Sequence, residues 1–424
     1  MRRSAGLTLA TLLLTAGTCG TALAGTPARE PGTAPRTATG TARAATGTAR
    51  AATGTARAAT GTARAATGRA RAATGRARAA ALTRLHATSS HAFVDSAGTT
   101  HLLTGPNIQP VWDAHDTGTW GQSTYDSIKA KGFTAVRMVL FWDMFQPTEA
   151  EWNETAFATL ATAVTRAKAA GLYVILDCVH MSGGNDGQEH VPGWAQVTPD
   201  DTTEGLDAVV ENGLGFLQTI ANRYQDEPAI AAYDPVNEPF RSSTRSARLL
   251  SDYTKIVNAI RAKDGVTNIM LEPSYGDSKV PASSFSSFTP TNRGNLIWSV
   301  HDYYNGAAKS GYTNGYDNST GLGMVPNPSD GTTGYNSANK AGLASHLQVQ
   351  LDLAKTEGLP VWIGEFGIGA GATGHDQYVK DKVALYKSKG LDYAWWEYSS
   401  GNGSGPFSMV DANENWRSWV SYLF

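Results

Sequence analysis

The chain has 424 residues, with 35 Lys and Arg against 37 Asp and Glu, and hydrophobic residues make up 41% of it. This composition fits a globular domain and argues against a fibrous or wholly disordered chain. Charge is uneven, because residues 25–90 contain eleven arginines and one acidic residue, Glu30. The remainder is acidic, which argues against nucleic acid as a partner. Beyond the first residues, no stretch is long and apolar enough to span a bilayer.

The N-terminus predicts a secretory signal peptide over residues 1–24. Met1-Arg2-Arg3 supplies a positive start, residues 7–14 form a short apolar stretch, and Ala22-Leu23-Ala24 is a small-residue cleavage site. The apolar stretch is too short to cross a membrane, so we expect a secreted, extracellular protein. Cleavage would leave one cysteine, Cys178, which lies in an apolar strand pattern and is expected to act as a small buried hydrophobic residue.

Residues 39–80 consist of six seven-residue repeats. Thr-Gly-Thr-Ala-Arg-Ala-Ala occurs four times and Thr-Gly-Arg-Ala-Arg-Ala-Ala twice. A period of seven is also that of a coiled coil, but alanine is the only apolar residue here and glycine recurs in every repeat, so there is no hydrophobic seam. We therefore predict that residues 25–90 form a basic, low-complexity, disordered linker. Its expected role is a solvated spacer, and contact with anionic cell-wall polymers is the alternative.

Residues 91–424 are expected to form a single catalytic domain, an α/β fold of the (β/α)8 TIM barrel type. Such a barrel typically has ~250 residues and grows with insertions. Eight apolar runs are expected to be strands, namely 102–108, 133–140, 172–177, 229–236, 268–272, 296–300, 360–364 and 392–396. Helical patterns lie between several of them, at 121–131, 155–170, 206–224, 244–263, 342–357 and 376–389.

Glycine directly follows an expected helix at four joints, namely Gly132, Gly171, Gly358 and Gly390. Glycine accepts the left-handed backbone conformation that ends a helix, so these joints favour a wound α/β fold. The alternative is an open, doubly wound sheet. The chain has no Gly-rich phosphate loop after the first strand, and its polar candidates fall on many strands, which favours the barrel.

Two glutamates follow apolar, strand-like runs. Glu238 comes after the run at 229–236, and Glu365 comes after the run at 359–364. The carboxyl ends of barrel strands are where these folds keep their chemistry. Two carboxylates are the minimum apparatus for hydrolysing a glycosidic bond, at roughly 5–5.5 Å apart in retaining enzymes and ~6.5–9.5 Å in inverting ones. Sequence spacing alone leaves both possibilities open.

Six motifs, in chain order along the expected strands, resemble glycoside hydrolase family 5, the cellulase family. They are Gly105-Pro106-Asn107, Arg137, Asn237-Glu238-Pro239, His301-Asp302-Tyr303, Gly364-Glu365-Phe366-Gly367 and Trp395-Trp396-Glu397-Tyr398. The resemblance covers roughly residues 95–424 and none of the basic segment. It implies that Glu238 is the general acid/base, that Glu365 is the nucleophile, and that anomeric configuration is retained.

The resemblance also assigns supporting roles. Arg137 would hold Glu365 ionised through its charge and a forked hydrogen bond. The pKa of Glu238 is expected to be raised by a dry site and a nearby carboxylate, so that it keeps its proton. Contacts with substrate or with the two glutamates are expected from His180, Asn237, His301, Tyr303 and Trp396. His180 departs from the family pattern, because it lies three residues after Asp177 where the family places its histidine two residues after.

The expected function is therefore a secreted retaining β-glycosidase that acts on a β-linked oligo- or polysaccharide as a monomer. We expect no cofactor and no metal, because the sequence has no cluster with metal-ligand spacing. A β-1,4-glucan endohydrolase is the first choice, and a β-mannanase, an exo-acting β-glucosidase type and a glycolipid-cleaving enzyme are the alternatives. From other classes, the alternatives are a non-catalytic polysaccharide-binding barrel and a protein anchored at the cell surface.

Overall fold

The computed structural model describes most of the chain after residue 80. The described residues are 81–110, 120–181, 189–197, 205–239, 248–273, 282–306, 312–313, 316–317, 334–399, 403 and 405–424. The predicted signal peptide and most of the predicted linker lie outside them. Among these residues, we find no helix that combines the length and the apolar character needed to cross a lipid bilayer.

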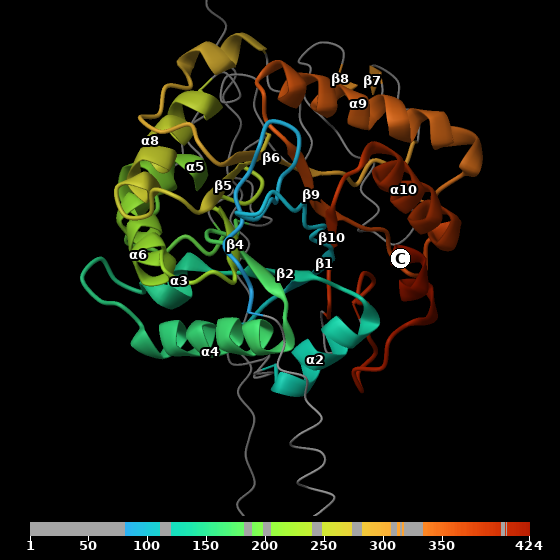
Figure 1. Cartoon of the computed structure of the whole chain (residues 1–424), viewed down its shortest axis with the longest axis horizontal. Helices are drawn as coiled ribbons and strands as arrows, with labels where there is room; N and C mark the ends of the chain where they lie inside the picture. The colour runs from blue at the N-terminus through green and yellow to red at the C-terminus, as the bar shows by residue number, and fades with distance from the viewer. Residues whose placement is uncertain are drawn as a thin grey trace, which may run out of the picture. The chain divides into compact units, whose positions relative to one another are not determined.

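Within the described residues, eight parallel strands close into a barrel in the order β1-β10-β9-β6-β5-β4-β3-β2 (Figure 1). Their bounds are β1 Gly105–Ile108, β2 Ala135–Val139, β3 Tyr173–Asp177, β4 Ile230–Asp234, β5 Asn268–Leu271, β6 Leu296–His301, β9 Val361–Phe366 and β10 Tyr393–Trp395. The barrel closes where Gly105 pairs with Ala394 and Pro106 with Trp395. The predicted (β/α)8 barrel is confirmed, and the open sheet is excluded because the first strand pairs with the last.

Helices surround the barrel, as Figure 1 shows. They are α2 Gln122–Lys131, α3 Trp142–Phe145, α4 Glu154–Ala170, α5 Gly205–Ala208, α6 Leu214–Tyr224, α8 Leu249–Arg261, α9 Lys340–Thr356 and α10 His375–Lys389. All six predicted helices are present, although the one predicted at 206–224 is divided into α5, a π-helical turn and α6. The described part of the β5–β6 connection contains only a short 3-10 helix, Ala282–Ser287. Two-residue strands β7 (Tyr312–Thr313) and β8 (Tyr316–Asp317) form a separate antiparallel pair.

The helix–glycine–strand joints have the predicted backbone conformation. Their φ angles are 115° at Gly132, 79° at Gly171, and 67° at both Gly358 and Gly390. The backbone N–H groups of Gly132, Gly171 and Gly390 donate to carbonyl oxygens in the last turn of the preceding helix. Each glycine therefore ends a helix and turns the chain directly into the next strand.

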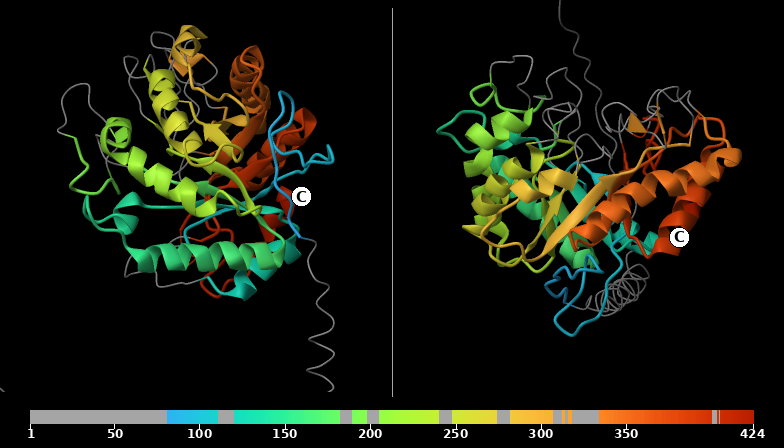
Figure 2. Two further views of the ribbon diagram at one scale, coloured as in Figure 1. Left: turned by 60° about the vertical axis from the view of Figure 1, so that its left-hand side comes forward. Right: turned by 90° about the horizontal axis from the view of Figure 1, so that it is seen from above.

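A short N-terminal segment covers the end of the barrel where the strands begin (Figure 2, right-hand view). Leu85, Phe93 and Leu103 are buried among strand residues that include Ala135 and Trp362. Phe93 meets Trp362 edge to face, with ring centroids 6.4 Å apart. The folded part thus includes Leu85, and the predicted linker boundary at residue 90 is too late. The sequence does not reveal this, because the apolar positions of the segment are isolated and show no periodicity.

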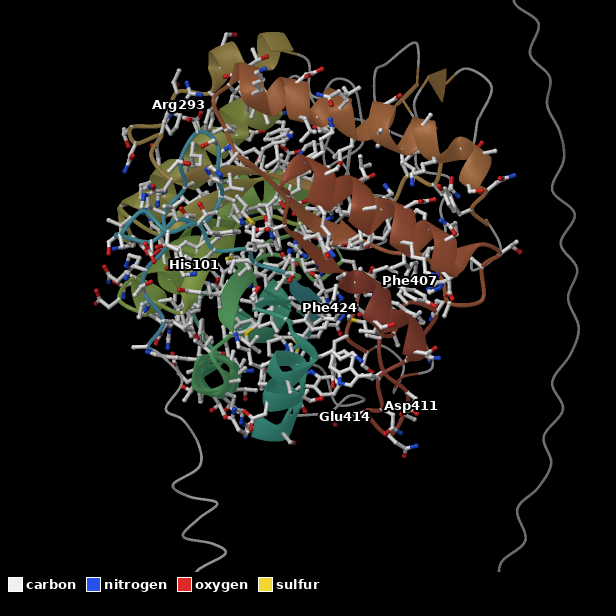
Figure 3. The ribbon with its side chains drawn as sticks, turned by 45° about the vertical axis from the view of Figure 1, so that its right-hand side comes forward. His101, Arg293, Phe407, Asp411, Glu414 and Phe424 are labelled. Atoms are coloured by element: carbon white, nitrogen blue, oxygen red, sulfur yellow. The ribbon has the colours of Figure 1, made fainter. Side chains whose placement is uncertain are left out.

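The C-terminal residues brace the outside of the barrel near α2. Phe424, labelled in Figure 3, packs on Phe133 with ring centroids 4.8 Å apart. A Cβ atom at Gly132 would lie 2.9 Å from the ring of Phe424, and the φ of 115° at Gly132 also favours glycine. Glu414 accepts a hydrogen bond from the hydroxyl of Thr124 on α2. These contacts join the last strand region to the first helix.

Asp392, just before β10, is a buried carboxyl far from the catalytic strand ends. Its Oδ2 accepts a hydrogen bond from the Leu103 backbone at 2.9 Å. Burial raises the pKa of Asp392 from its ordinary 3.8 to about 7. The folded protein therefore binds a proton that the unfolded chain releases between about pH 4 and pH 7, so this group makes the fold less stable as pH rises through that window.

We predict that Asp392→Asn removes this loss of folding stability at higher pH. A shift of this size corresponds to roughly 4 kcal/mol between protonation states. The variant should match the parent near pH 4 and become more stable by up to that amount near pH 8, as measured by urea unfolding at a series of pH values. Asp352→Asn, which alters an exposed carboxylate on α9, is the control. Parallel stability curves for the parent and Asp392→Asn would contradict the assignment.

Candidate active site

A buried arginine occupies the centre of the barrel mouth. In β2, Val136 and Met138 pack outward against the helices, whereas Ala135 and Arg137 alternate with them and face inward. The Arg137 side chain is completely buried. A buried charge of this kind is tolerated only when it is paired and fully hydrogen-bonded, so its neighbours define the site.

Among the described residues, four carboxylates surround the Arg137 guanidinium. Nη1 lies 2.8 Å from Glu365 Oε1 and 3.2 Å from Asp177 Oδ2. Nη2 lies 2.9 Å from Asp234 Oδ2 and 3.2 Å from Glu272 Oε1. The same guanidinium donates to the side-chain oxygens of Asn107 and Asn237. These partners come from the carboxyl ends of five different strands, which Arg137 ties together.

Glu238, Glu365 and His301 meet beside this cluster. His301 Nδ1 lies 3.1 Å from Glu238 Oε1 and 3.6 Å from Glu365 Oε2. One oxygen of each glutamate and one nitrogen of His301 all lie within 4.8 Å of one another. The two carboxylates therefore face one point, and this limit on their nearest oxygens fits a retaining pair, whose carboxyl groups lie roughly 5–5.5 Å apart.

The backbone at Glu238 is held in an unusual conformation. Its φ angle is +43°, in the left-handed region that few non-glycine residues adopt. Its N–H donates to Glu272 Oε2 at 2.7 Å. Left-handed backbone persists at functional sites where surrounding contacts impose it. Here that contact comes from a carboxylate on the neighbouring strand end.

Gly364, which precedes Glu365, gives room for His301. A Cβ atom at Gly364 would lie 2.6 Å from Ser299 Oγ and 2.8 Å from His301 Nε2. His301 and Glu365 are also paired across the β6–β9 ladder. The glycine in this motif is thus required for the imidazole to reach both glutamates.

Tyr303 contacts Glu365, the contact predicted from the sequence, and Asn237 contacts Arg137. The Tyr303 hydroxyl donates to Glu365 Oε2 at 2.7 Å, so Glu365 is held at one oxygen by the tyrosine and at the other by Arg137. Asn237 accepts from Arg137, and its amide nitrogen is 3.4 Å from the Met181 carbonyl oxygen. Both side chains are therefore fixed before any ligand is present.

His180 also reaches the site despite its shifted position in the sequence. Its Nδ1 lies 2.7 Å from Asp177 Oδ2, and its ring stacks on Trp396 at 5.3 Å with an interplanar angle of 4°. Cys178 and Val179 both pack into the outer core, so the extra residue is accommodated between Asp177 and His180. Cys178 is buried, as predicted. Trp396 stays partly exposed at the mouth of the barrel.

The pKa values of the two glutamates differ from the prediction. Burial works to raise the pKa of Glu238, but the hydrogen bond and positive charge of His301 outweigh it, so the pKa is lowered. Burial raises the pKa of Glu365 against the charges of His301 and Arg137. The prediction of a raised pKa for Glu238 is thus wrong for the free site, because it considered burial and the neighbouring carboxylate but not the imidazole.

His301 itself is expected to carry the proton. Burial would lower its pKa, but the facing carboxylates of Glu272, Glu365 and Glu238 raise it well above the ordinary value. An imidazolium whose Nδ1–H points at Glu238 is consistent with the lowered pKa of that glutamate. In the free site the proton is therefore held by the Glu238–His301 pair.

Among the residues that the structure describes, two groups of side chains have spacing that would admit a metal ion. They are Asp234, Glu272 and His301, and Glu238, His301 and Glu365, each with ligand atoms within 4.8 Å. The sequence pattern did not indicate such clusters. Arg137 contacts carboxylates of both groups, however, and its positive charge would repel a cation at either place. The donor sets thus fit proton chemistry better than metal binding.

Two site residues, Asp234 and Glu272, were not singled out from the sequence. Glu272 comes directly after β5 and Asp234 is the last residue of β4, and both side chains are fully buried. The signal that identified Glu365, an apolar run that ends at a carboxylate, is present at both positions. The sequence does not show that the inward-facing Arg137 is the common partner of both carboxylates.

We predict that Arg137→Lys is strongly destabilising, by ~3–5 kcal/mol, because an ammonium cannot reach all the carboxylates and leaves buried charge unpaired. Urea unfolding at pH 7 measures this, and the difference from the parent should narrow at lower pH as the carboxylates take up protons. Arg223→Lys, which alters a surface ion pair with Glu154, is the control and should change stability by less than about 1 kcal/mol. Equal effects of the two substitutions would contradict the central role of Arg137.

Comparison with known proteins agrees with this geometry. Residues 94–402 match the family model of cellulase (glycosyl hydrolase family 5). Endoglucanase A of Clostridium longisporum is 25% identical over 333 residues, which cover 73% of this chain and 58% of that protein. Endoglycoceramidase I of Rhodococcus hoagii (strain 103S) is 23% identical over 374 residues, which cover 77% and 70%.

A solved structure shares the fold. The crystal structure of an endogalactoceramidase superimposes with a TM-score of 0.60 at 19% identity and covers 81% of this chain and 84% of that one. Because the family match spans more than half of the residues, the chain belongs to glycoside hydrolase family 5.

Proposed function

We propose that this protein hydrolyses β-glycosides with retention of configuration, by double displacement. The observation that carries the proposal is that one oxygen each of Glu238 and Glu365 lie within 4.8 Å. In the first step, a carboxylate oxygen of Glu365 bonds to the anomeric carbon while the bond to the leaving oxygen breaks, and Glu238 gives that oxygen a proton. The product is a glycosyl ester on Glu365 and a free aglycone.

The second step releases the sugar. A water molecule gives a proton to Glu238, its oxygen bonds to the anomeric carbon, and the ester bond to Glu365 breaks. Glu365 leaves as a carboxylate, and contacts with Arg137 and Tyr303 stabilise that charge. Two inversions at one carbon give net retention.

His301 has a place in this cycle that the sequence did not indicate. Its Nδ1 lies between the two glutamates, at 3.1 Å and 3.6 Å. A proton on the imidazole can move to Glu238 along the existing hydrogen bond as the leaving oxygen gains charge. The pair thereby supplies an acid in the first step while Glu238 alone stays available as a base in the second.

For the substrate, we propose a β-1,4-glucan cleaved at internal bonds by the secreted protein. Support comes from the family, from the endoglucanase relative, and from the signal-peptide pattern at residues 1–24. His180 and Trp396 stack at the barrel mouth and offer an aromatic face on which a glucose ring packs well. The chain covers 58% of that endoglucanase, so the activity of the whole relative is carried over only as part of this proposal.

A glycolipid is the second candidate substrate. The favouring observation is that endoglycoceramidase I aligns with 77% of this chain, a larger share than the endoglucanase does. The segments 111–119, 182–188, 240–247, 274–281 and 318–333, which follow five different strands, lie outside the described residues. In TIM barrels, the loops that follow the strands form the substrate site.

We predict that Glu365→Gln lowers kcat by roughly three orders of magnitude or more, because an amide cannot form the glycosyl ester. The thermal midpoint should stay nearly unchanged, because an excess of carboxylates faces Arg137 and loss of one negative charge relieves repulsion. Glu211→Gln, on an exposed position of the outer layer, is the control. Retained hydrolysis by Glu365→Gln would refute the mechanism, and a wild-type protein that binds polymer without releasing reducing ends would favour the binding-protein alternative.

A substrate panel separates the two candidates. Purified protein is incubated with carboxymethyl cellulose, β-mannan, cello-oligosaccharides, aryl β-glucoside and lactosylceramide in detergent. The proposal predicts release of cello-oligosaccharides from internal bonds, with the β-anomer appearing first by proton NMR. Cleavage of lactosylceramide alone would replace the glucan by the glycolipid, and first appearance of the α-anomer would contradict retention for either substrate.

A further inference from the structure

The carboxyl of Glu272 touches both parts of the acid/base apparatus. Oε2 accepts the backbone N–H of Glu238 at 2.7 Å. Oε1 lies 3.1 Å from His301 Nε2 and 3.2 Å from Arg137 Nη2. The Glu272 side chain is fully buried, and its own N–H donates to the hydroxyl of Tyr253 on α8 at 2.9 Å.

These contacts have a geometric consequence. Glu238 is held in the left-handed region at φ +43°, and the bond from its N–H to Glu272 fixes that turn. The imidazole of His301 lies between Glu272 at Nε2 and Glu238 at Nδ1. Glu272 thus sets both the place from which the Glu238 carboxyl projects and the direction in which its imidazole partner points.

The surroundings of Glu272 leave it no contact with substrate. The charged and titratable groups that face it are Arg137 from β2, Asp234 from β4, His301 from β6 and the Tyr253 hydroxyl from α8. Glu365 faces the same imidazole from the opposite side. Because Glu272 is 0% exposed, any effect on catalysis must pass through the groups it contacts, which are Glu238, His301 and Arg137.

We propose that Glu272 is the positioning residue of the acid/base Glu238, acting through its backbone turn and through His301, an inference that rests on the proposed double displacement. This carboxyl accepts at both oxygens, from Glu238 N–H and from Arg137 Nη2, whereas an amide has only one acceptor oxygen. If its oxygen accepts from Glu238 N–H, its NH2 group faces the donors of Arg137 and the imidazole. If the amide is flipped, NH2 faces the N–H of Glu238. One of the two contacts becomes donor against donor in either orientation.

The test compares leaving groups that differ in their need for an acid. The 2,4-dinitrophenolate group leaves without being protonated, whereas a phenolate group needs a proton from an acid to leave. For Glu272→Gln we expect kcat/KM on phenyl β-cellobioside to fall by about a hundredfold, within the usual range of general acid catalysis. On the dinitrophenyl glycoside we expect a fall of less than about threefold, and azide should accelerate turnover by intercepting the glycosyl-enzyme in place of base-activated water.

Matched variants make the result decisive. Asp177→Asn alters another buried carboxylate of Arg137, one whose second partner is His180, so it should slow both glycosides by the same factor. Tyr253→Phe removes the anchor of the Glu272 backbone and should give the Glu272→Gln pattern at smaller amplitude, even if Glu272→Gln does not fold. The size of the dinitrophenolate burst counts functional sites in each preparation.

Three results would overturn the inference. If Glu272→Gln lowers kcat/KM equally on both glycosides, the role of Glu272 is merely structural. If Glu272→Gln gives no dinitrophenolate burst, an equal loss of kcat/KM on both glycosides in Tyr253→Phe leads to the same conclusion. A wild-type protein that releases no dinitrophenolate from β-cellobioside or β-lactoside would instead refute the proposed function on which the inference rests. If Glu272→Gln loses kcat/KM only on the phenyl glycoside and azide accelerates its turnover, the positioning role of Glu272 is supported.

Discussion

One buried guanidinium holds this active site together. Arg137 lies inside the barrel, and carboxylates from four other strand ends converge on it. A lone charge in that position would be prohibitively costly, and so would the carboxylates without it. The arginine and its acids are therefore interdependent, and the strand ends meet where their charges can be neutralised.

The pairing of Arg137 with its surrounding acids also determines the chemistry of the site. Arg137 and Tyr303 each hold one oxygen of Glu365, so the orientation of this carboxylate does not depend on substrate. The acids exceed the cations in number, which keeps a proton on His301, and the hydrogen bond and charge of that imidazolium lower the pKa of Glu238. A site that is fixed and charged before binding needs little reorganisation in the transition state, where such electrostatic terms are largest.

Much of the fold could be predicted from the sequence because its signals are local. Apolar runs of strand length, helical periodicity and the glycines at Gly132, Gly171, Gly358 and Gly390 each act within a few residues. The closure of the barrel follows from their repetition. The packing of Leu85 beneath the strands could not be predicted, because isolated apolar residues acquire meaning only once the barrel end exists to receive them.

The site was predictable to the same extent. The strand-end glutamates and Arg137 stand out as polar residues at the ends or in the middle of apolar runs. Glu272 also follows an apolar run, but its importance comes from the pairing of the strands. That pairing places it against Glu238 and His301, which lie 34 and 29 positions away in the sequence. The pKa of Glu238 was mispredicted for the same reason, because it depends on an imidazole that reaches it from another strand.

The central claim is that Glu365 forms a covalent bond to sugar while Glu238 faces it across the same anomeric carbon. A 2-deoxy-2-fluoro glycoside with a dinitrophenyl leaving group traps such an intermediate, because the fluorine slows its hydrolysis. Peptide mass spectrometry of the treated protein should place one glycosyl group on Glu365. A label on Glu238 or on another residue, or hydrolysis of ordinary glycosides with no trapped species under any condition, would contradict the account.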